Sequence, residues 1–499
     1  MKKTLFFAIL ILSIGLFFRL FNIASVPPGL YPDEAMNGNN IMEALHTGTY
    51  KWFYPENNGR EGLFINIQAA FLQFFGVNEP WVLRLPSAIF GTLTVLGIFF
   101  LARELFSVHA GLLSSLLLAT SFWHIMFSRI GFRAIMAPFF LVWAVYYLLQ
   151  AFRGNSSANQ QILFSIFSGA LFGLGFYTYI SYRVMPLLLL LFIPFFSHGK
   201  NFRRVNLLFI LTTFLVALPI GLYYLNNPAD FLGRTAQVSV FSSPTPLQDL
   251  GSNIVKTAGM FNLEGDWNWR HNYAGAPQLF WPVGILFLIG CALAIKNLIQ
   301  SAKINPPTGG QNCNSKLKNH PAAQDPKVLH FDFSFLILLA WLFLAALPVV
   351  ISNEGLPHAL RAILMLPPVV ILAAVGGVAL YNMLPKNLSR IVMVIVIVIL
   401  AAEPFQTYFG KWATDPNATD AFAADYVAIG REMNRLPKET QKYVEVVAGG
   451  VDVRGIPMPA QTVMFITDSF TPEQQREKNI HYVLPGQTIP PEAKVFQIQ

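Results

Sequence analysis

Long apolar runs separated by short polar breaks dominate the first four-fifths of the chain. A bilayer core about 30 Å thick needs roughly 20 apolar residues in a helix, and the chain contains about eleven runs near that size. These runs predict a polytopic, all-α membrane protein. The expected spans are residues 4–24, 82–101, 110–127, 134–152, 162–180, 184–197, 205–225, 279–298, 333–352, 362–382 and 389–403. The sixth run is short and contains Pro186 and Pro194.

The composition agrees with a chain that is largely solvated by lipid. Apolar residues make up 54% of the 499 positions and charged residues only 12%, about half the charged fraction of a typical soluble protein. The net charge of +8 comes from basic residues in loops, so we expect no nucleic-acid partner. Cys291 lies in an apolar run and Cys313 in a polar linker, which excludes a disulfide framework and a thiolate metal site.

The basic residues also predict an orientation. Lys2 and Lys3 precede an uninterrupted apolar stretch, residues 4–18, and Arg19 follows it without the small residues of a cleavage site. An uncleaved helix with a cytoplasmic N-terminus is therefore expected. Lys and Arg then gather in the loops on that side, which include a polar linker, 301–332, of flexible composition. The expected location is the plasma (inner) membrane, with multiple spans and an extracytoplasmic C-terminus.

Two domains are expected. Residues 1–403 form the transmembrane part, with large external loops at 25–81 and 226–278, and residues 404–499 form a small extracytoplasmic α/β domain. In this tail, apolar residues recur at helical spacing at Phe422, Tyr426, Ile429, Met433 and Leu436. Short strand-like runs follow at 443–447, 462–467 and 481–484.

Acidic residues of the first external loop are the first candidates for chemistry. Asp33 and Glu34 follow the first span closely, and Glu61 stands between Arg60 and Gly62. A carboxylate at the membrane boundary can act as a general base towards a hydroxyl group, and a second one can orient the substrate or hold a divalent cation. The spacing leaves base, orienting residue and metal ligand as open alternatives, beside the simpler one of a solvated acidic pair.

Arginines gather on the same predicted face. Arg129 and Arg133 lie in one tight loop, and Arg361 follows His358 by three residues in a later loop, so these two would share a helix face. A guanidinium group matches the geometry of phosphate, although an arginine at a helix end often reaches only to lipid phosphates. As a set, the arginines predict a cationic site opposite the acidic loop.

The second large loop combines aromatic and polar residues. Its sequence reads Asp266, Trp267, Asn268, Trp269, Arg270 and His271. Tryptophans concentrate at the depth of lipid headgroups, and their indole faces also stack on sugar rings. The sequence supports an interfacial belt and a sugar or acceptor platform about equally.

Four segments together resemble a known family. Asp33-Glu34 resembles its signature acid, the stretch from Arg60 to Leu63 stands at its second acidic motif, Val82 to Ser87 matches the start of its second main helix, and Glu354 to Arg361 resembles a late-loop motif of bacterial members. The family is the C-type glycosyltransferases that use polyprenyl-phosphate sugars, including protein O-mannosyltransferases and lipid A aminoarabinose transferases. The resemblance covers residues 4–403 and departs at Arg60-Glu61-Gly62, where many relatives have Lys-Pro after the acid.

This resemblance implies an inverting transfer of a sugar from a polyprenyl-phosphate donor to an acceptor hydroxyl at the external membrane face. Asp33 would be the base, and Glu34 and Glu61 would orient the acceptor. A divalent cation held by these three acids stays an alternative, and no other cofactor is implied. The donor phosphate would bind Arg60, Arg129, Arg133, His358 and Arg361. The sugar or a glycan, lipid or protein acceptor would bind Asp266, Trp267, Trp269, Arg270 and His271.

Other functions predict other patterns. A ligase or polymerase of lipid-linked oligosaccharides would share the lipid-phosphate site and differ in the size of its donor. A secondary transporter would carry paired half-repeats and polar breaks near the centres of its spans, whereas the charges here cluster at one face. A receptor with a simple anchor would not need so many spans.

Overall fold

The computed structural model describes residues 2–153, 156–197, 200–237, 239–304 and 326–499. Within these ranges, eight helices are long and apolar enough to cross a membrane. They belong to α1 (Lys2–Leu20), α4 (Pro80–Leu105), α7 (Met136–Phe152), α9 (Lys200–Asn226), α12 (Trp281–Ile304), α13 (Pro326–Val350), α14 (Leu366–Met383) and α15 (Lys386–Pro404). The polytopic helical fold predicted from hydropathy is therefore confirmed.

A ninth apolar segment is bent, which fits either a broken span or a re-entrant loop. Helices α5 (Val108–Ala119) and α6 (Phe122–Ser128) meet at 62° and together pass the same test of length and composition. The break follows from Ser121, whose hydroxyl accepts a hydrogen bond from the His124 N–H and so starts a new helix.

The two remaining predicted spans take different forms. Helix α8 (Ala158–Gly175) packs against α7 and α9. The run predicted as a helix over 184–197 is instead a 3₁₀ helix, η2 (Ile180–Ser197), because Pro186 and Pro194 cannot donate backbone hydrogen bonds. Its apolar part, Ile180–Leu191, is shorter than the eight candidate spans, so a crossing at this position stays a prediction.

The expected polar linker is only partly described. Its first residues, 301–304, end α12, and its last residues, 326–332, begin α13, so both ends are helical. Residues 305–325 lie outside the described residues.

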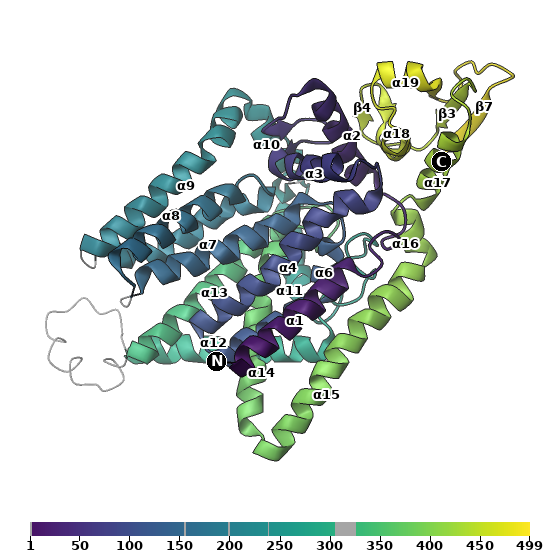
Figure 1. The fold of residues 1–499 in the computed structure, drawn as a ribbon. Helices are drawn as coiled ribbons and strands as arrows, with labels where there is room; N and C mark the ends of the chain where they lie inside the picture. Colours follow the sequence, from purple (N-terminus) through teal and green to yellow (C-terminus); the bar gives the residue numbers. More distant parts are fainter. Residues whose placement is uncertain (1, 154–155, 198–199, 238, 305–325) are drawn as a thin grey trace.

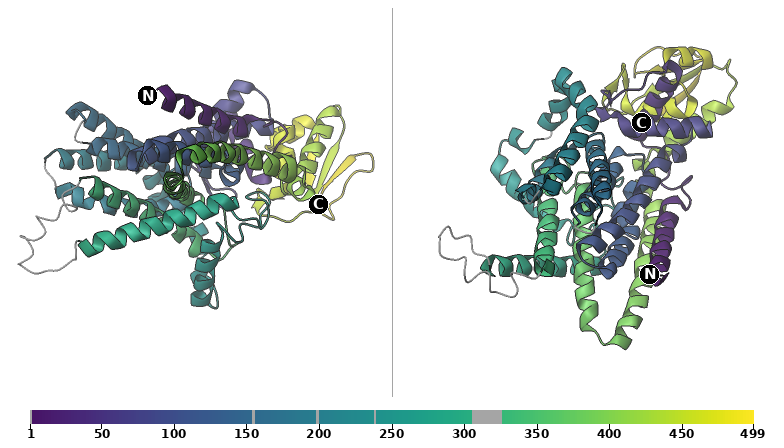
Figure 2. Two further views of the ribbon diagram at one scale, coloured as in Figure 1. Left: turned by 90° about the horizontal axis from the view of Figure 1, so that it is seen from below. Right: turned by 60° about the vertical axis from the view of Figure 1, so that its left-hand side comes forward.

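The helices form an elongated bundle with two different ends (Figures 1 and 2). The N-terminus and the turn between α14 and α15 lie at one end. The first loop, with α2 (Pro32–Thr47) and α3 (Gly62–Phe75), lies at the other end beside the C-terminal strands. In the first loop, β1 (Phe53–Tyr54) pairs antiparallel with β2 (Arg60–Glu61).

The C-terminal part is an α/β structure. Its sheet has the order β6-β3-β7, with β3 (Lys442–Val446) parallel to both β6 (Ile480–Val483) and β7 (Lys494–Ile498). Around this sheet and the β4–β5 hairpin (Asp452–Val453, Ile456–Pro457) lie α16 (Pro416–Ala421), α17 (Ala424–Arg435), α18 (Gln461–Thr467) and α19 (Pro472–Lys478). The helical segment after Ile391 continues to Thr414, past the predicted boundary at 404, so that division into two domains stays a prediction.

Two of the three strands predicted in this part are confirmed, at 443–447 and 481–484, as is the amphipathic helix, which is α17. The strand predicted over 462–467 is wrong, because this segment is α18 and every one of its residues is buried. A short run that is buried on all sides has no periodicity to separate helix from strand.

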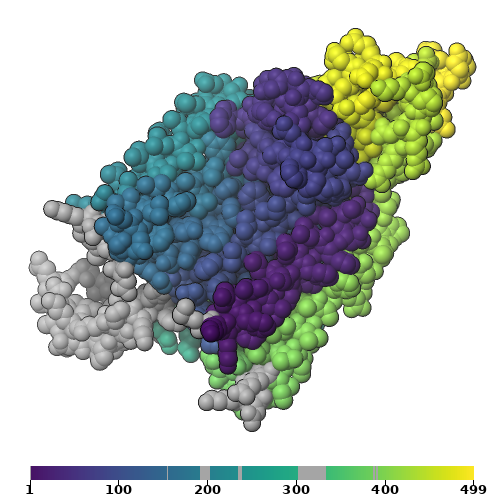
Figure 3. Space-filling view, viewed as in Figure 1, coloured from purple at the N-terminus to yellow at the C-terminus, as the bar shows by residue number. Residues whose placement is uncertain are grey.

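The C-terminal part packs directly on the first loop. Helix α18 packs on α2, and the Asn39 amide donates to the Gln461 carbonyl at 3.0 Å. Just before α2, the Leu30 carbonyl accepts a hydrogen bond from the Thr462 hydroxyl at 2.9 Å. A Cβ on Gly38 would lie 2.4 Å from the Phe465 ring, so the close approach needs a glycine. Figure 3 shows the two regions in contact along this face.

Candidate active site

A cavity of about 570 Å³ lies where the first loop meets the C-terminal part. This volume is within the usual range for small-molecule sites. Eight separate stretches of the sequence contribute to it. The lining residues include Tyr31, Asp33, Asn37, Asn57, Arg60, Phe132, Arg133, Tyr179, Arg270, Glu354, Leu360, Asp420, Tyr426, Gly449, Gly450, Met458 and Pro459.

Asp33 brings a carboxylate to this cavity. It stands in the first turn of α2, whose first residue is Pro32, a residue favoured at that position because its ring fixes a helical φ. The Asn57 amide donates a hydrogen bond to Asp33 Oδ1, and Asn57 itself lines the cavity. The side chain is therefore held in place while it remains half-buried.

Glu34, the next residue, has a different environment. Its side chain is fully buried, and its two oxygens each lie 3.0 Å from a nitrogen of Arg84. The Gly131 N–H donates to the same carboxylate at 2.6 Å. Arg84 also donates to the carbonyls of Pro27 and Gly29. Glu34 thus fastens α2 to α4 and to the loop around residue 131.

Arg60 and Glu61 form β2 and are both buried. Arg60 lines the cavity and donates to Asn37 Oδ1 at 2.6 Å and to Asn40 Oδ1 at 2.5 Å. Burial, with the nearby positive charge of Arg133, lowers the pKa of Arg60 to about 10, so the group is still charged at neutral pH. Glu61 accepts a hydrogen bond from Arg133 Nε at 2.7 Å.

The two arginines of the loop at 129–133 separate. Arg133 lines the cavity, and its guanidinium lies 5.7 Å from the centre of the Tyr179 ring. Arg129 is fully buried and donates to the carbonyls of Phe18 at 2.9 Å and Val26 at 2.7 Å. Arg129 therefore ties the end of α1 to this loop.

In the second large loop, Arg270 is the residue that reaches the cavity. Its guanidinium lies 4.0 Å from the centre of the Tyr31 ring, and its Nε donates to Asn268 Oδ1 at 3.1 Å. Trp267 is 62% exposed and donates to Glu264. The Trp269 carbonyl accepts a hydrogen bond from Trp412. Arg270 therefore lines the cavity, whereas Trp267 and Trp269 do not.

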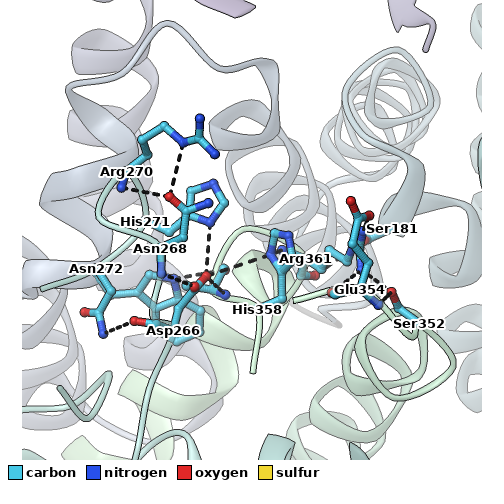
Figure 4. A network of polar contacts seen from close by, with 12 residues as sticks. Ser181, Asp266, Asn268, Arg270, His271, Asn272, Ser352, Glu354, His358 and Arg361 are labelled. Carbon is cyan, nitrogen blue, oxygen red and sulfur yellow. Dashed lines mark hydrogen bonds and ion pairs between the residues drawn. The ribbon is translucent and has the colours of Figure 1, made fainter. Parts of the chain in front are cut away.

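Asp266, His271 and His358 form a separate buried cluster (Figure 4). Asp266 Oδ2 lies 3.0 Å from His271 Nδ1 and 3.9 Å from His358 Nδ1. Beyond this cluster, Arg361 forms an ion pair with Glu354 at 2.5 Å and donates to the Glu354 carbonyl at 2.9 Å. His358 and Arg361 thus organise the late loop, from which Glu354 and Leu360 reach the cavity.

Four of the predicted site residues line the cavity, namely Asp33, Arg60, Arg133 and Arg270. In the described part of the chain, the others lie off its wall: Glu34, Glu61, Arg129, Asp266, Trp267, Trp269, His271, His358 and Arg361. Two of the three acids proposed as cation ligands already form ion pairs, Glu34 with Arg84 and Glu61 with Arg133. This geometry does not favour a cation between them and Asp33.

Sequence reasoning missed other lining residues. The position of Asn57 could have been noticed, because the sequence Asn57-Asn58-Gly59 predicts a turn within the acidic loop. No local sequence pattern places the other missed residues near Asp33; these are Tyr179, Asp420 and Tyr426.

Comparisons with known proteins bear on the fold that carries this site. Residues 63–223 match the family described as dolichyl-phosphate-mannose-protein mannosyltransferase. None of the curated proteins matches the chain. The solved structure of ArnT from Cupriavidus metallidurans bound to undecaprenyl phosphate aligns with a TM-score of 0.56 at 14% identity, over 95% of this chain and 89% of that one. The chain has the fold of the C-type membrane glycosyltransferases.

A second group of similar structures is the oligosaccharyltransferase of Archaeoglobus fulgidus. Its apo form aligns with a TM-score of 0.57 at 14% identity and covers 93% of this chain, which spans 64% of that protein's length. The same enzyme in complex with Zn and sulfate aligns with a TM-score of 0.56 at 14% identity, over 92% of this chain and 61% of that one. The resemblance seen in the sequence is thus confirmed, and family match and fold together indicate a membrane glycosyltransferase that uses lipid-linked donors.

Proposed function

We propose that this chain is an inverting glycosyltransferase that moves a sugar from a polyprenyl-phosphate donor to an acceptor hydroxyl at the external membrane face. The proposal rests on one observation: Asp33 and the arginines Arg60, Arg133 and Arg270 line the same cavity. This reaction needs one group to accept a proton and several to stabilise a phosphate. The cavity offers both.

Asp33 is the base in this proposal. As the acceptor oxygen attacks the anomeric carbon, the acceptor O–H proton passes to Asp33 and the bond from that carbon to the phosphate oxygen breaks. The electron pair leaves with the polyprenyl phosphate, whose charge changes from about −1 to about −2. Because phosphate is a good leaving group, no general acid is needed, in contrast to glycoside hydrolysis.

The growing phosphate charge is assigned to Arg133 and Arg270. Arg133 is held by Glu61, and Arg270 makes no ion pair with any described residue, so its charge is available to a ligand. Arg60 adds positive potential from a buried position. Arg129, His358 and Arg361, which were predicted for this role, instead support the loops that carry these residues, as Glu34 and Glu61 do.

The donor class follows from the membrane setting. ArnT is bound to undecaprenyl phosphate and the archaeal oligosaccharyltransferase to dolichol phosphate in their structures. A lipid carrier would bring its phosphate to a cavity at the end of the bundle. With a cytoplasmic N-terminus in the plasma (inner) membrane, that end would be extracytoplasmic, since the N-terminus lies at the opposite end (Figure 1).

The test is sugar transfer in proteoliposomes that contain the purified chain. A panel of labelled polyprenyl-phosphate monosaccharides is offered together with extracted glycan, lipid and peptide acceptors. Asp33→Asn is compared with Asp425→Asn, which changes an exposed aspartate of α17. We expect transfer by the wild type and Asp425→Asn, loss in Asp33→Asn, and an inverted anomeric configuration in the product.

Three results would contradict the proposal. Transfer by Asp33→Asn at the wild-type rate would show that Asp33 is not the base. Transfer from lipid-linked oligosaccharides alone would make the chain a ligase, and movement of an intact donor across the vesicle without product would make it a transporter.

A further inference from the structure

A second site lies beside the cavity, in the cluster of Asp266, His271 and His358. One side-chain ligand atom from each residue lies within 4.8 Å of the other two. Asp266 and His271 are buried, and His358 is nearly so. Among the described residues, no other group of three or more His, Cys, Asp or Glu side chains comes this close together.

These ligand atoms suit one class of metal ion. Two imidazole nitrogens and a carboxylate oxygen form a ligand set that Zn²⁺ prefers. Ligands at about 2.0–2.2 Å from a tetrahedral ion lie about 3.3 Å from one another. The two separations from Asp266 Oδ2, 3.0 Å and 3.9 Å, lie on either side of that value, so small side-chain movements would complete the geometry.

Hydrogen bonds already hold the carboxylate in place. The Asn268 N–H donates to Asp266 Oδ1 at 2.8 Å, and the Ala359 N–H donates to Asp266 Oδ2 at 2.8 Å. Such contacts around a ligand fix its orientation before an ion binds. They also come from both loops, because Asn268 follows Asp266 and Ala359 follows His358.

Aromatic residues cover the cluster. The His271 ring lies against the Phe127 ring with centroids 5.6 Å apart and against His358 at 5.0 Å. The Trp123 indole donates to the Ala359 carbonyl at 3.1 Å. An apolar surrounding of this kind strengthens the attraction between a cation and its ligands.

We propose that Asp266, His271 and His358 bind one divalent cation of the zinc class and that this ion cross-links the second large loop to the late loop. Asp266 and His271 belong to one of these loops and His358 to the other. Arg270, next to His271, and Leu360, two residues after His358, both line the cavity. The ion thus fixes the loop ends that carry cavity residues, and it takes no part in the transfer itself. The site does not depend on the proposed reaction, so its test uses metal binding alone.

The first measurement is the zinc content of the full-length protein in detergent. The protein is stripped with EDTA, incubated with ZnCl₂, passed through a desalting column and measured by mass spectrometry for elements. We expect about one zinc ion per chain in the wild type, and at least a tenfold lower content in His271→Gln and in Asp266→Asn. The matched control His46→Gln, His109→Gln removes two exposed imidazoles and should retain the ion.

Two further measurements avoid dependence on the folding of the variants. Cobalt(II) added to the stripped wild type should produce the visible absorption bands of a four-coordinate ion, and zinc should displace them. Hydrogen exchange should slow in residues 264–275 and 352–362 when zinc is added, while α17 remains unchanged. A wild type that holds no stoichiometric zinc, or that holds as much zinc in His271→Gln as without the substitution, would overturn the proposal and leave a hydrogen-bonded His-Asp cluster.

Discussion

The two walls of the cavity are built in opposite ways. The wall formed by the bundle and its loops presents the charged groups Asp33, Arg60, Arg133, Arg270 and Glu354. The wall formed by the C-terminal part presents mostly small and apolar residues, which are Ala421, Ala423, Gly449, Gly450, Val451, Met458 and Pro459, with Tyr426 and Asp420. The first wall offers groups for reaction chemistry, and the second determines the shape of the cavity.

The difference shows what a charged wall requires. Buried partners hold two of these groups: Asn37 and Asn40 accept hydrogen bonds from Arg60, and Glu61 accepts one from Arg133. A buried polar or charged group is costly unless it is paired, so the buried Arg60 and the paired Arg133 depend on these polar residues. The apolar wall needs no such support and is therefore free to vary in shape.

The largest effect is expected at the charged wall, for Asp33→Asn. The change keeps the shape of the side chain and its contact with Asn57 but removes the proton acceptor, so kcat should fall about 10²- to 10⁴-fold. Transfer assays at saturating donor and acceptor measure it. An unchanged kcat would mean that the carboxylate presented to the cavity has no role in the chemistry.

Support behind that wall is tested by Glu34→Gln. It leaves the Arg84 charge buried without its counter-ion, and losing one partner of a buried pair costs about 3–5 kcal/mol in unfolding free energy. Denaturant unfolding in detergent measures the loss. Glu79→Gln is the control, because its ion pair with Arg431 is exposed and should contribute about 0–1 kcal/mol. Equal losses in both variants would show that the buried pair gives no special support.

A smaller effect is expected for Arg270→Ala. Removing a charged hydrogen-bond donor costs about 1.5–3 kcal/mol, so kcat/KM for the donor should fall about 10- to 150-fold, with a smaller change for the acceptor. The control is Arg431→Ala, which removes an exposed guanidinium from the C-terminal part. If donor and acceptor kinetics change equally, Arg270 does not bind the phosphate.

The smallest effect is expected on the apolar wall, for Gly449→Leu. A Cβ on Gly449 would meet no atom within 4 Å, so the added side chain occupies cavity space without a clash. The KM of the acceptor should change about tenfold while that of the donor stays constant. Gly410→Leu, also at an open position, should leave both constants unchanged. A change confined to the donor would reverse the roles of the two walls.

Hydropathy was sufficient to predict the helical crossings, because their length and apolar content are local properties. The form of η2 was not predictable in the same way, although Pro186 and Pro194 marked it as unusual. At 462–467 the prediction of a strand failed, since burial on all sides removed the periodic signal.

The site was predictable only in part. Asp33, Arg60, Arg133 and Arg270 were named from the sequence and line the cavity, but their neighbours of the same chemical type do not. Nothing local separates Asp33 from Glu34, because the partner that decides the matter, Arg84, is 50 positions away. The apolar wall could not be predicted at all, since it comes from the other end of the chain.

The contact between the two ends of the chain also sets an order of events during synthesis. The charged wall is complete once residues near Glu354 have been made, but the cavity is not closed until the segment around Gly449 and Pro459 leaves the ribosome and docks on α2. A nascent chain therefore carries an open, polar groove while the residues between Glu354 and Pro459 are being made. If the cavity is the transfer site, as proposed, activity needs nearly the whole chain, and removal of the segment after α15 would return the protein to this unfinished state.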